Sequence, residues 1–239
     1  MAQAQWLTLD TADGPMQAYE VVPDGAPKGA VIVIQEAFGV NEHIQDVARR
    51  TADAGYHAIA PAIFHRAGGG VAEYGDFKGI MALIQGLSDD GLLMDVDAAL
   101  AHLQTKGFAP GQVGIVGFCM GGRITFLVAA RRAIGAGVGY YGGGIVSEGR
   151  LPFPALIGDV ATMKTPWLGI FGDKDASIPV EDVERLRAEL DAKAPVDHGV
   201  IRYPDADHGF NCNDRASYHE ASAADAWPKT LEFFAKHLR

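Results

Sequence analysis

Cysteine is scarce in this sequence. Its 239 residues include only two cysteines, Cys119 and Cys212. Two cysteines are too few for the disulfide framework of a secreted protein, and neither has a second cysteine at the short spacing of a metal site. The start of the sequence also lacks the basic stretch and apolar core of a secretory signal. We therefore expect a protein of the reducing cytoplasm.

Positive charge is also in the minority. The sequence has 20 Lys and Arg against 30 Asp and Glu, and its net charge is −10. Nucleic acids and anionic membranes are bound through clustered basic residues, so neither is expected as the main partner. The longest uncharged stretch, residues 107–122, is too short for a bilayer-spanning helix and contains Pro110. A small molecule is the expected partner, and nothing in the sequence indicates an oligomeric state.

The composition excludes disorder, because 48% of the residues are hydrophobic and only 21% are charged. The length fits one large α/β domain, and we expect residues 1–239 to form a single one. Neither an internal repeat nor a change of composition indicates a second domain.

Short apolar runs alternate with stretches of helical periodicity along the chain. The predicted strands are 6–9, 16–22, 30–35, 57–61, 113–118, 135–140, 166–172 and 199–203, and the predicted helices are 43–54, 92–105, 120–132, 180–193 and 217–237. The first two strands flank the turn signal Asp13-Gly14 and predict an antiparallel hairpin. The rest predicts a mostly parallel central sheet with helices on both faces. Residues 64–88 break the alternation and are expected to form a loop and short helix over one end of the sheet.

The most informative segment, residues 113–123, has the sequence VGIVGFCMGGR. An apolar strand, a Gly-x-Cys-x-Gly turn and a helix are typical of a nucleophile elbow, with Cys119 in place of the usual serine. Gly117 and Gly121 allow so tight a turn, and the helix N-terminus favours a thiolate. Two alternatives are a buried, inert cysteine and a dinucleotide-binding turn. The glycine spacing is not G-x-G-x-x-G, which argues against the second.

A base and an acid follow two later predicted strands. His208 follows the strand ending near residue 203, and Asp173 and Asp175 follow the strand ending near residue 172. Like Cys119, they lie beyond the carboxyl ends of parallel strands, where open α/β sheets place their sites. The order nucleophile, acid, histidine is that of α/β-hydrolases. Spacing alone leaves the choice between the two aspartates open.

The histidines are also compatible with ordinary structural roles. His208 could be an ordinary loop histidine, and His43, His102 and His237 lie on predicted helices and need no function. The sequence Asp-Ala-Asp-His around residue 208 lacks a second histidine, so it is a poor transition-metal signal.

At these residues the sequence resembles the dienelactone hydrolase family of α/β-hydrolases. The matching motifs are VIVIQEAFGVN at 31–41, AP at 60–61, GFCMGG at 117–122, YYG at 140–142, GDKD at 172–175 and ADHGF at 206–210. The resemblance implies that Cys119 is the nucleophile, His208 the base and Asp175, rather than Asp173, the acid.

The resemblance also implies roles for three further residues. Glu36 corresponds to a glutamate held near the resting thiol and displaced by substrate, although the residue by itself is equally compatible with a solvated loop end. A carboxylate beside a thiol raises the pKa of the thiol, which would protect it from indiscriminate modification. The backbone N–H groups of Phe38 and Met120 correspond to the oxyanion hole. Neither an organic cofactor nor a metal is implied.

The sequence departs from the family at the residues that bind the substrate carboxylate. Family members that open dienelactone are implied to use two arginines, and Cys212 stands where one is expected. Arg66 and Arg215 are the candidates to replace them. The substrate can therefore be a lactone or ester other than dienelactone.

We predict an ester or lactone hydrolase with a Cys-His-Asp triad that acts through a thioester acyl-enzyme. The main alternative is a catalytically silent α/β-hydrolase-fold protein that binds a ligand or senses oxidation through Cys119. A nucleotide-dependent oxidoreductase is disfavoured by the glycine spacing.

Overall fold

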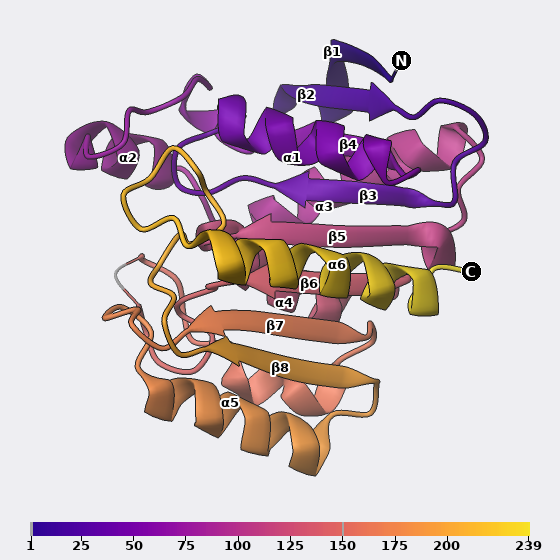
Figure 1. The fold of residues 1–239 in the computed structure, drawn as a ribbon. Helices are drawn as coiled ribbons and strands as arrows, with labels where there is room; N and C mark the ends of the chain where they lie inside the picture. Colours follow the sequence, from indigo (N-terminus) through magenta and orange to yellow (C-terminus); the bar gives the residue numbers. More distant parts are fainter. Residues whose placement is uncertain (1, 150) are drawn as a thin grey trace.

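The computed structural model describes residues 2–149 and 151–239. These residues form one 8-stranded sheet in the order β1-β2-β4-β3-β5-β6-β7-β8 (Figure 1). The strands are β1 (Gln3–Thr11), β2 (Gly14–Val22), β3 (Ala30–Ile34), β4 (His57–Pro61), β5 (Val113–Phe118), β6 (Ala136–Tyr140), β7 (Trp167–Gly172) and β8 (His198–Tyr203). β1 and β2 are antiparallel, β2 is antiparallel to β4, and the remaining neighbours are parallel. The predicted hairpin and mostly parallel sheet are confirmed.

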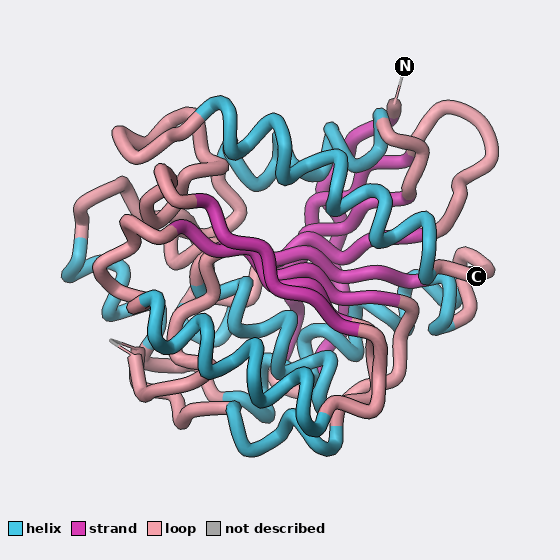
Figure 2. Tube along the Cα trace, turned by 60° about the horizontal axis from the view of Figure 1, so that its bottom comes forward, coloured by secondary structure: helices cyan, strands magenta, loops and turns pink. Residues whose placement is uncertain are grey.

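The helices lie in two layers around the sheet. They are α1 (Glu42–Asp53), α2 (Phe77–Ile84), α3 (Asp89–Thr105), α4 (Met120–Arg131), α5 (Val180–Lys193) and α6 (Glu220–His237), with the short 3₁₀ helices η1 (His65–Ala67), η2 (Pro110–Gln112) and η3 (Ile157–Thr162). Figure 1 shows α1 and α6 over one face of the sheet and α3 and α4 behind it. Figure 2 shows the twisted sheet enclosed between these layers. Of the helices described, none combines the length and apolar character needed to cross a membrane.

The centre of the molecule is built from the strands that the sequence shows as continuous apolar runs. Every residue of β3, β4, β5, β6 and β7 is buried, as expected for parallel strands covered on both faces. α4 is buried along nearly its whole length and packs behind β5 and β6. The turn from β5 into α4, which carries Cys119, is therefore held between two buried elements.

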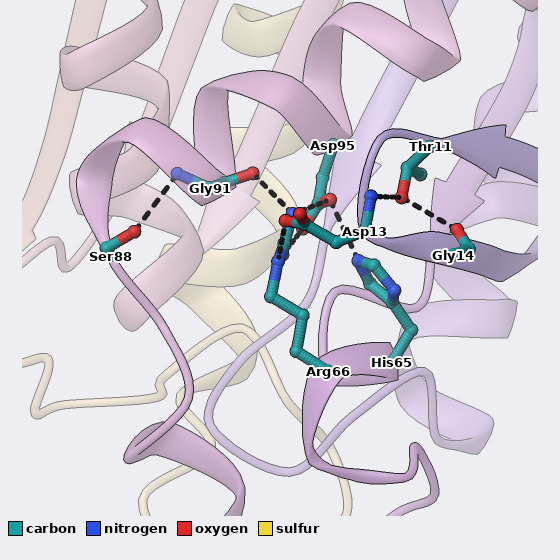
Figure 3. Close-up of polar contacts among 8 residues, drawn as sticks. All are labelled: Thr11, Asp13, Gly14, His65, Arg66, Ser88, Gly91 and Asp95. Atoms are coloured by element: carbon teal, nitrogen blue, oxygen red, sulfur yellow. Dashed lines mark hydrogen bonds and ion pairs between the residues drawn. The ribbon is translucent and has the colours of Figure 1, made fainter.

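Residues 64–88 form the predicted loop and short helix, η1 and α2, beside the carboxyl ends of the parallel strands. Arg66 fastens this segment to the body of the protein (Figure 3). Its guanidinium donates to both carboxylate oxygens of Asp95 on α3 at 2.8 and 2.9 Å, and to Asp13 in the β1–β2 turn at 2.6 Å. The network holds three distant parts of the chain together.

Candidate active site

Cys119 lies in a strained turn between β5 and α4. Its φ of 54° is in the left-handed region, which non-glycine residues rarely adopt. Its backbone N–H donates to the carbonyl of Tyr140 at 3.0 Å, and its carbonyl accepts from the N–H of Arg123 at 3.3 Å. The side chain is partly exposed, whereas its neighbours Phe118 and Met120 are buried. The reading of Cys119 as a fully buried hydrophobe is therefore wrong.

Two glycines allow this turn to pack against β3. A Cβ on Gly117 would overlap the carbonyl oxygen of Gly121, and a Cβ on Gly121 would lie 2.5 Å from the carbonyl oxygen of Ile34. Larger residues would push the first turn of α4 away from the end of β3. The contact places Cys119 beside the loop that follows β3, which carries Glu36 and Phe38.

His208 and Asp175 meet at the same edge of the sheet, from the loops after β8 and β7. Nδ1 of His208 lies 2.6 Å from Oδ2 of Asp175. The other oxygen of Asp175 accepts from the N–H and hydroxyl of Ser177 at 2.8 and 2.5 Å. Burial acts to raise the pKa of Asp175, but these hydrogen bonds and the charge of His208 lower it below the usual range. Asp175 is therefore ionised, while Asp173 pairs with Arg202 at 2.7 Å.

His208 interacts with Cys119 as well as with Asp175. Burial acts to lower the pKa of His208, yet the charge of Cys119 and hydrogen bonds to Asp175 and Cys119 raise it to about 10. Nδ1 faces Asp175, which leaves Nε2 for the thiol. The centre of the Tyr141 ring lies 5.1 Å from the centre of the His208 ring. Like Cys119, Tyr141 has a positive φ, of 37°. The arrangement favours a protonated His208, an imidazolium that interacts with both side chains.

Glu36 is buried rather than solvated, with 1% of its surface exposed. Its Oε1 accepts from Nη1 of Arg215 at 3.2 Å, and its Oε2 has no hydrogen-bond partner among the described residues. Burial raises the pKa of Glu36, against the opposing charges of Arg215 and His208. The alternative of a solvated loop end is therefore wrong.

The structure separates the two arginines that the sequence offered for anion binding. Arg66 is committed to Asp95 and Asp13 (Figure 3). Arg215 lies against Glu36, with its guanidinium carbon 5.7 Å from the centre of the Phe38 ring. Only Arg215 of this pair therefore has a place at the site.

The segments that carry Phe38 and Met120 converge beside Cys119. Met120 is the first residue of α4, and the opening N–H groups of a helix have no acceptor within it. Phe38 belongs to the loop after β3, against which Gly121 packs. Its ring makes an edge contact with Tyr74, at 4.5 Å between ring centres.

Several residues at this edge have no motif in the sequence. Tyr74, from the segment before α2, has its hydroxyl 3.2 Å from Sγ of the buried Cys212. Burial raises the pKa of the Cys212 thiol. His43, which the sequence places on a helix with no need of a function, is buried close to Glu36 and Cys212, and these three could hold a metal ion. Its position four residues before Val47 on the apolar face of α1 is a signal for this burial.

A cavity of about 540 Å³ adjoins the Asp175 side of the site. Its lining includes Gly142, Ser177 and Ile178, so it borders the loop that holds the acid. The volume is within the range of small-molecule pockets.

The chain is similar in sequence and structure to known proteins. The model of the dienelactone hydrolase family matches residues 16–238. The "Putative carboxymethylenebutenolidase" of Salmonella typhimurium strain LT2 is 42% identical over 231 residues, which are 93% of this chain and 83% of that protein. The carboxymethylenebutenolidase of Pseudomonas putida is 28% identical over 217 residues, 89% of this chain and 88% of its own. The crystal structure of a "Putative Dienelactone Hydrolase" from Klebsiella pneumoniae is similar with a TM-score of 0.91 and 39% identity, covering 99% of this chain and 100% of that one.

Proposed function

Because the chain belongs to the dienelactone hydrolase family, we propose that it hydrolyses small esters or lactones with Cys119 as its nucleophile. The observation that carries this proposal is the position of Cys119 in a strained turn next to a histidine that is bonded to a buried aspartate. The three residues come from three loops at one edge of the sheet, and their order along the chain is that of the α/β-hydrolases.

The reaction begins with the Cys119 thiolate and the His208 imidazolium. The sulfur attacks the substrate carbonyl carbon, a C–S bond forms, and the carbonyl electron pair moves to oxygen. We assign stabilisation of this oxyanion to the backbone N–H groups of Phe38 and Met120. The tetrahedral intermediate then collapses, the ester C–O bond breaks, and the leaving oxygen takes the imidazolium proton.

The thioester that results is hydrolysed by water. Neutral His208 removes a proton from the water as it attacks, the C–S bond breaks, and the Cys119 thiolate and the imidazolium form again. Asp175 keeps Nδ1 of His208 protonated and directs Nε2 to the reacting atoms. With a lactone, the leaving oxygen stays attached to the acyl chain, so the product is a single hydroxy acid.

Glu36 and Arg215 belong to the resting site in this proposal. The Glu36 carboxylate and the Arg215 guanidinium neutralise each other's charge near Cys119 until a substrate binds. A substrate with a carboxylate near its ester bond would compete with Glu36 for the guanidinium of Arg215. This property favours small anionic lactones and esters over neutral ones.

Turnover of a panel of lactones and aryl esters tests the proposal. Cys119→Ala is expected to lower kcat by about 10³-fold or more, because it removes the attacking atom. Iodoacetamide labelling followed by mass spectrometry provides the matched control: Cys212→Ala should still be labelled at Cys119, and Cys119→Ala should lose the label. Equal turnover by the wild type and Cys119→Ala, or no hydrolysis by the wild type, would refute the assignment.

A further inference from the structure

Three side chains of metal-binding type meet near Arg215, which donates a hydrogen bond to one of them. Glu36 follows β3, His43 is the second residue of α1, and Cys212 lies in the loop between β8 and α6. A carboxylate oxygen, a ring nitrogen and the sulfur of these residues all lie within 4.8 Å of one another. All three side chains are buried, so they are shielded from competing water.

Glu36 and His43 each have one polar atom without a hydrogen-bond partner among the described residues. Oε2 of Glu36 and Nε2 of His43 are buried and make no hydrogen bond with the described residues. Buried polar atoms in folded proteins nearly always have a partner, so two such atoms in one small cluster require an explanation. The sulfur of Cys212 lies 3.2 Å from the hydroxyl of Tyr74, and a backbone hydrogen bond from Asp214 also acts on it. One cation could bind the oxygen, the nitrogen and the sulfur together.

We propose that Glu36, His43 and Cys212 form a binding site for a zinc ion. Oxygen, nitrogen and sulfur ligands together suit Zn²⁺, whereas Ca²⁺ and Mg²⁺ prefer oxygen alone. Tetrahedral Zn²⁺ at ordinary bond lengths holds its ligand atoms about 3.3–3.8 Å apart, so the side chains need to move by about 1 Å. Binding replaces the thiol proton of Cys212 with a Zn–S bond and releases that proton to solvent. Water completes the fourth position.

The neighbours of the cluster determine how the ion enters and how tightly it binds. Tyr74 is 38% exposed and touches Cys212, so the path from solvent opens when this contact breaks. Arg215 holds the other oxygen of Glu36 and repels a cation. We therefore expect Arg215→Gln to bind zinc several-fold more tightly than the wild type.

Cobalt(II) reports on this site because a cobalt–thiolate bond gives an intense charge-transfer absorption. The experiment uses Cys119→Ser, which removes the other thiol and with it the proposed nucleophile. Titration of this variant with Co²⁺ should produce the thiolate band with one ion per chain, and Zn²⁺ should displace it. Because it is measured without turnover, a failure here is distinct from a failure of the proposed hydrolysis.

Substitutions of the ligands identify the source of the band. Cys212→Ser should abolish it, and the isosteric Glu36→Gln should weaken zinc binding at least tenfold, as should His43→Gln. Zinc should raise the Tm of Cys119→Ser but not that of Cys119→Ser/Cys212→Ser, with circular dichroism confirming that each variant is folded. Absence of the band from Cys119→Ser, or unchanged zinc affinity in Glu36→Gln and His43→Gln, would overturn the proposal.

Discussion

Two buried glutamates, Glu20 on β2 and Glu36 after β3, have opposite surroundings. Each has 1% of its surface exposed. Glu20 accepts from Gln5 at 2.8 Å, from His57 at 2.9 Å and from His102 at 2.7 Å. Burial acts to raise the pKa of Glu20, but these hydrogen bonds lower it to about 2. Glu36 accepts from Arg215 at 3.2 Å, and burial raises its pKa.

The difference separates a carboxylate that supports the fold from one placed at a site. A buried charge costs stability unless hydrogen bonds and opposite charges offset its loss of water. Glu20 has those partners and links the edge hairpin to β4 and α3. One carboxylate oxygen of Glu36 has no hydrogen-bond partner among the described residues, which lowers stability rather than raising it. Incomplete pairing of a buried carboxylate is thus a useful pointer to function in this molecule.

Asp175 tests the link between incomplete hydrogen bonding and function most severely. Like Glu20, it is a buried carboxylate with several hydrogen bonds, yet we assign it to catalysis. Asp175→Asn should lower kcat by about 10³–10⁴-fold, since the amide no longer holds His208 in the tautomer that faces Cys119. Steady-state kinetics on the best ester of the panel measures it. Ser177→Ala is the matched control and should lose tenfold or less. A similar loss in both variants would mean that the loop, and not the carboxylate, matters.

Replacement of each glutamate by leucine tests the comparison directly. Glu20→Leu should lower the free energy of unfolding by about 2–5 kcal/mol, because His57, His102 and Gln5 lose their shared acceptor. Glu36→Leu should lower it by less than Glu20→Leu, because it removes a carboxyl group whose burial is unfavourable, and the cost that remains is the loss of the ion-pair partner of Arg215. Urea unfolding at neutral pH gives both values. The reverse order would remove the distinction.

The pH dependence of stability should differ in sign between the two glutamates. The pKa of Glu20 falls from 4.5 to about 2 on folding, so its stabilisation is complete above pH 4.5 and is lost as the pH falls towards 2. The pKa of Glu36 is raised, so its contribution is complete below pH 4.5 and is lost as the pH rises. Each slope is at most about 1.4 kcal/mol per pH unit.

Urea unfolding of the wild type, Glu20→Gln and Glu36→Gln across this pH range measures the two slopes. Glu20→Gln should flatten the acid side only, and Glu36→Gln should flatten the slope above pH 4.5 only. Identical profiles for both variants would show that the surroundings of the two carboxylates are equivalent in solution.

The smallest expected effect concerns Arg215, which forms an ion pair with Glu36. Arg215→Gln should lower kcat/KM by about tenfold for esters with a nearby carboxylate, because one charged hydrogen bond to the substrate is lost. It should lower kcat/KM less for neutral esters. Arg66→Gln is the control, because Arg66 is bonded to Asp95 and Asp13. It should lower the Tm without discriminating between anionic and neutral esters. Equal discrimination in both variants would remove Arg215 from substrate recognition.

Much of the fold follows from local sequence pattern. The predicted bounds of β4, β5 and α5 agree with the structure, and most other ends differ by one residue or a few. α3 begins at Asp89, three residues before the prediction, because the Ser88 hydroxyl accepts from the N–H of Gly91 and caps the helix. α6 begins three residues after the predicted position, at Glu220, where the His219 ring accepts from the N–H of Ser222. Side-chain caps set these helix ends.

The sequence by itself determined the alternating elements, the strained cysteine turn and the positions of His208 and Asp175 after their strands, because each depends on residues close together in the chain. Only the tertiary structure decided that Arg215 rather than Arg66 lies against Glu36, that His43 and Cys212 are buried beside that glutamate, and that Glu20 binds two histidines. These contacts join residues far apart in sequence. The order of strands in the sheet sets their distances, and no local pattern encodes it.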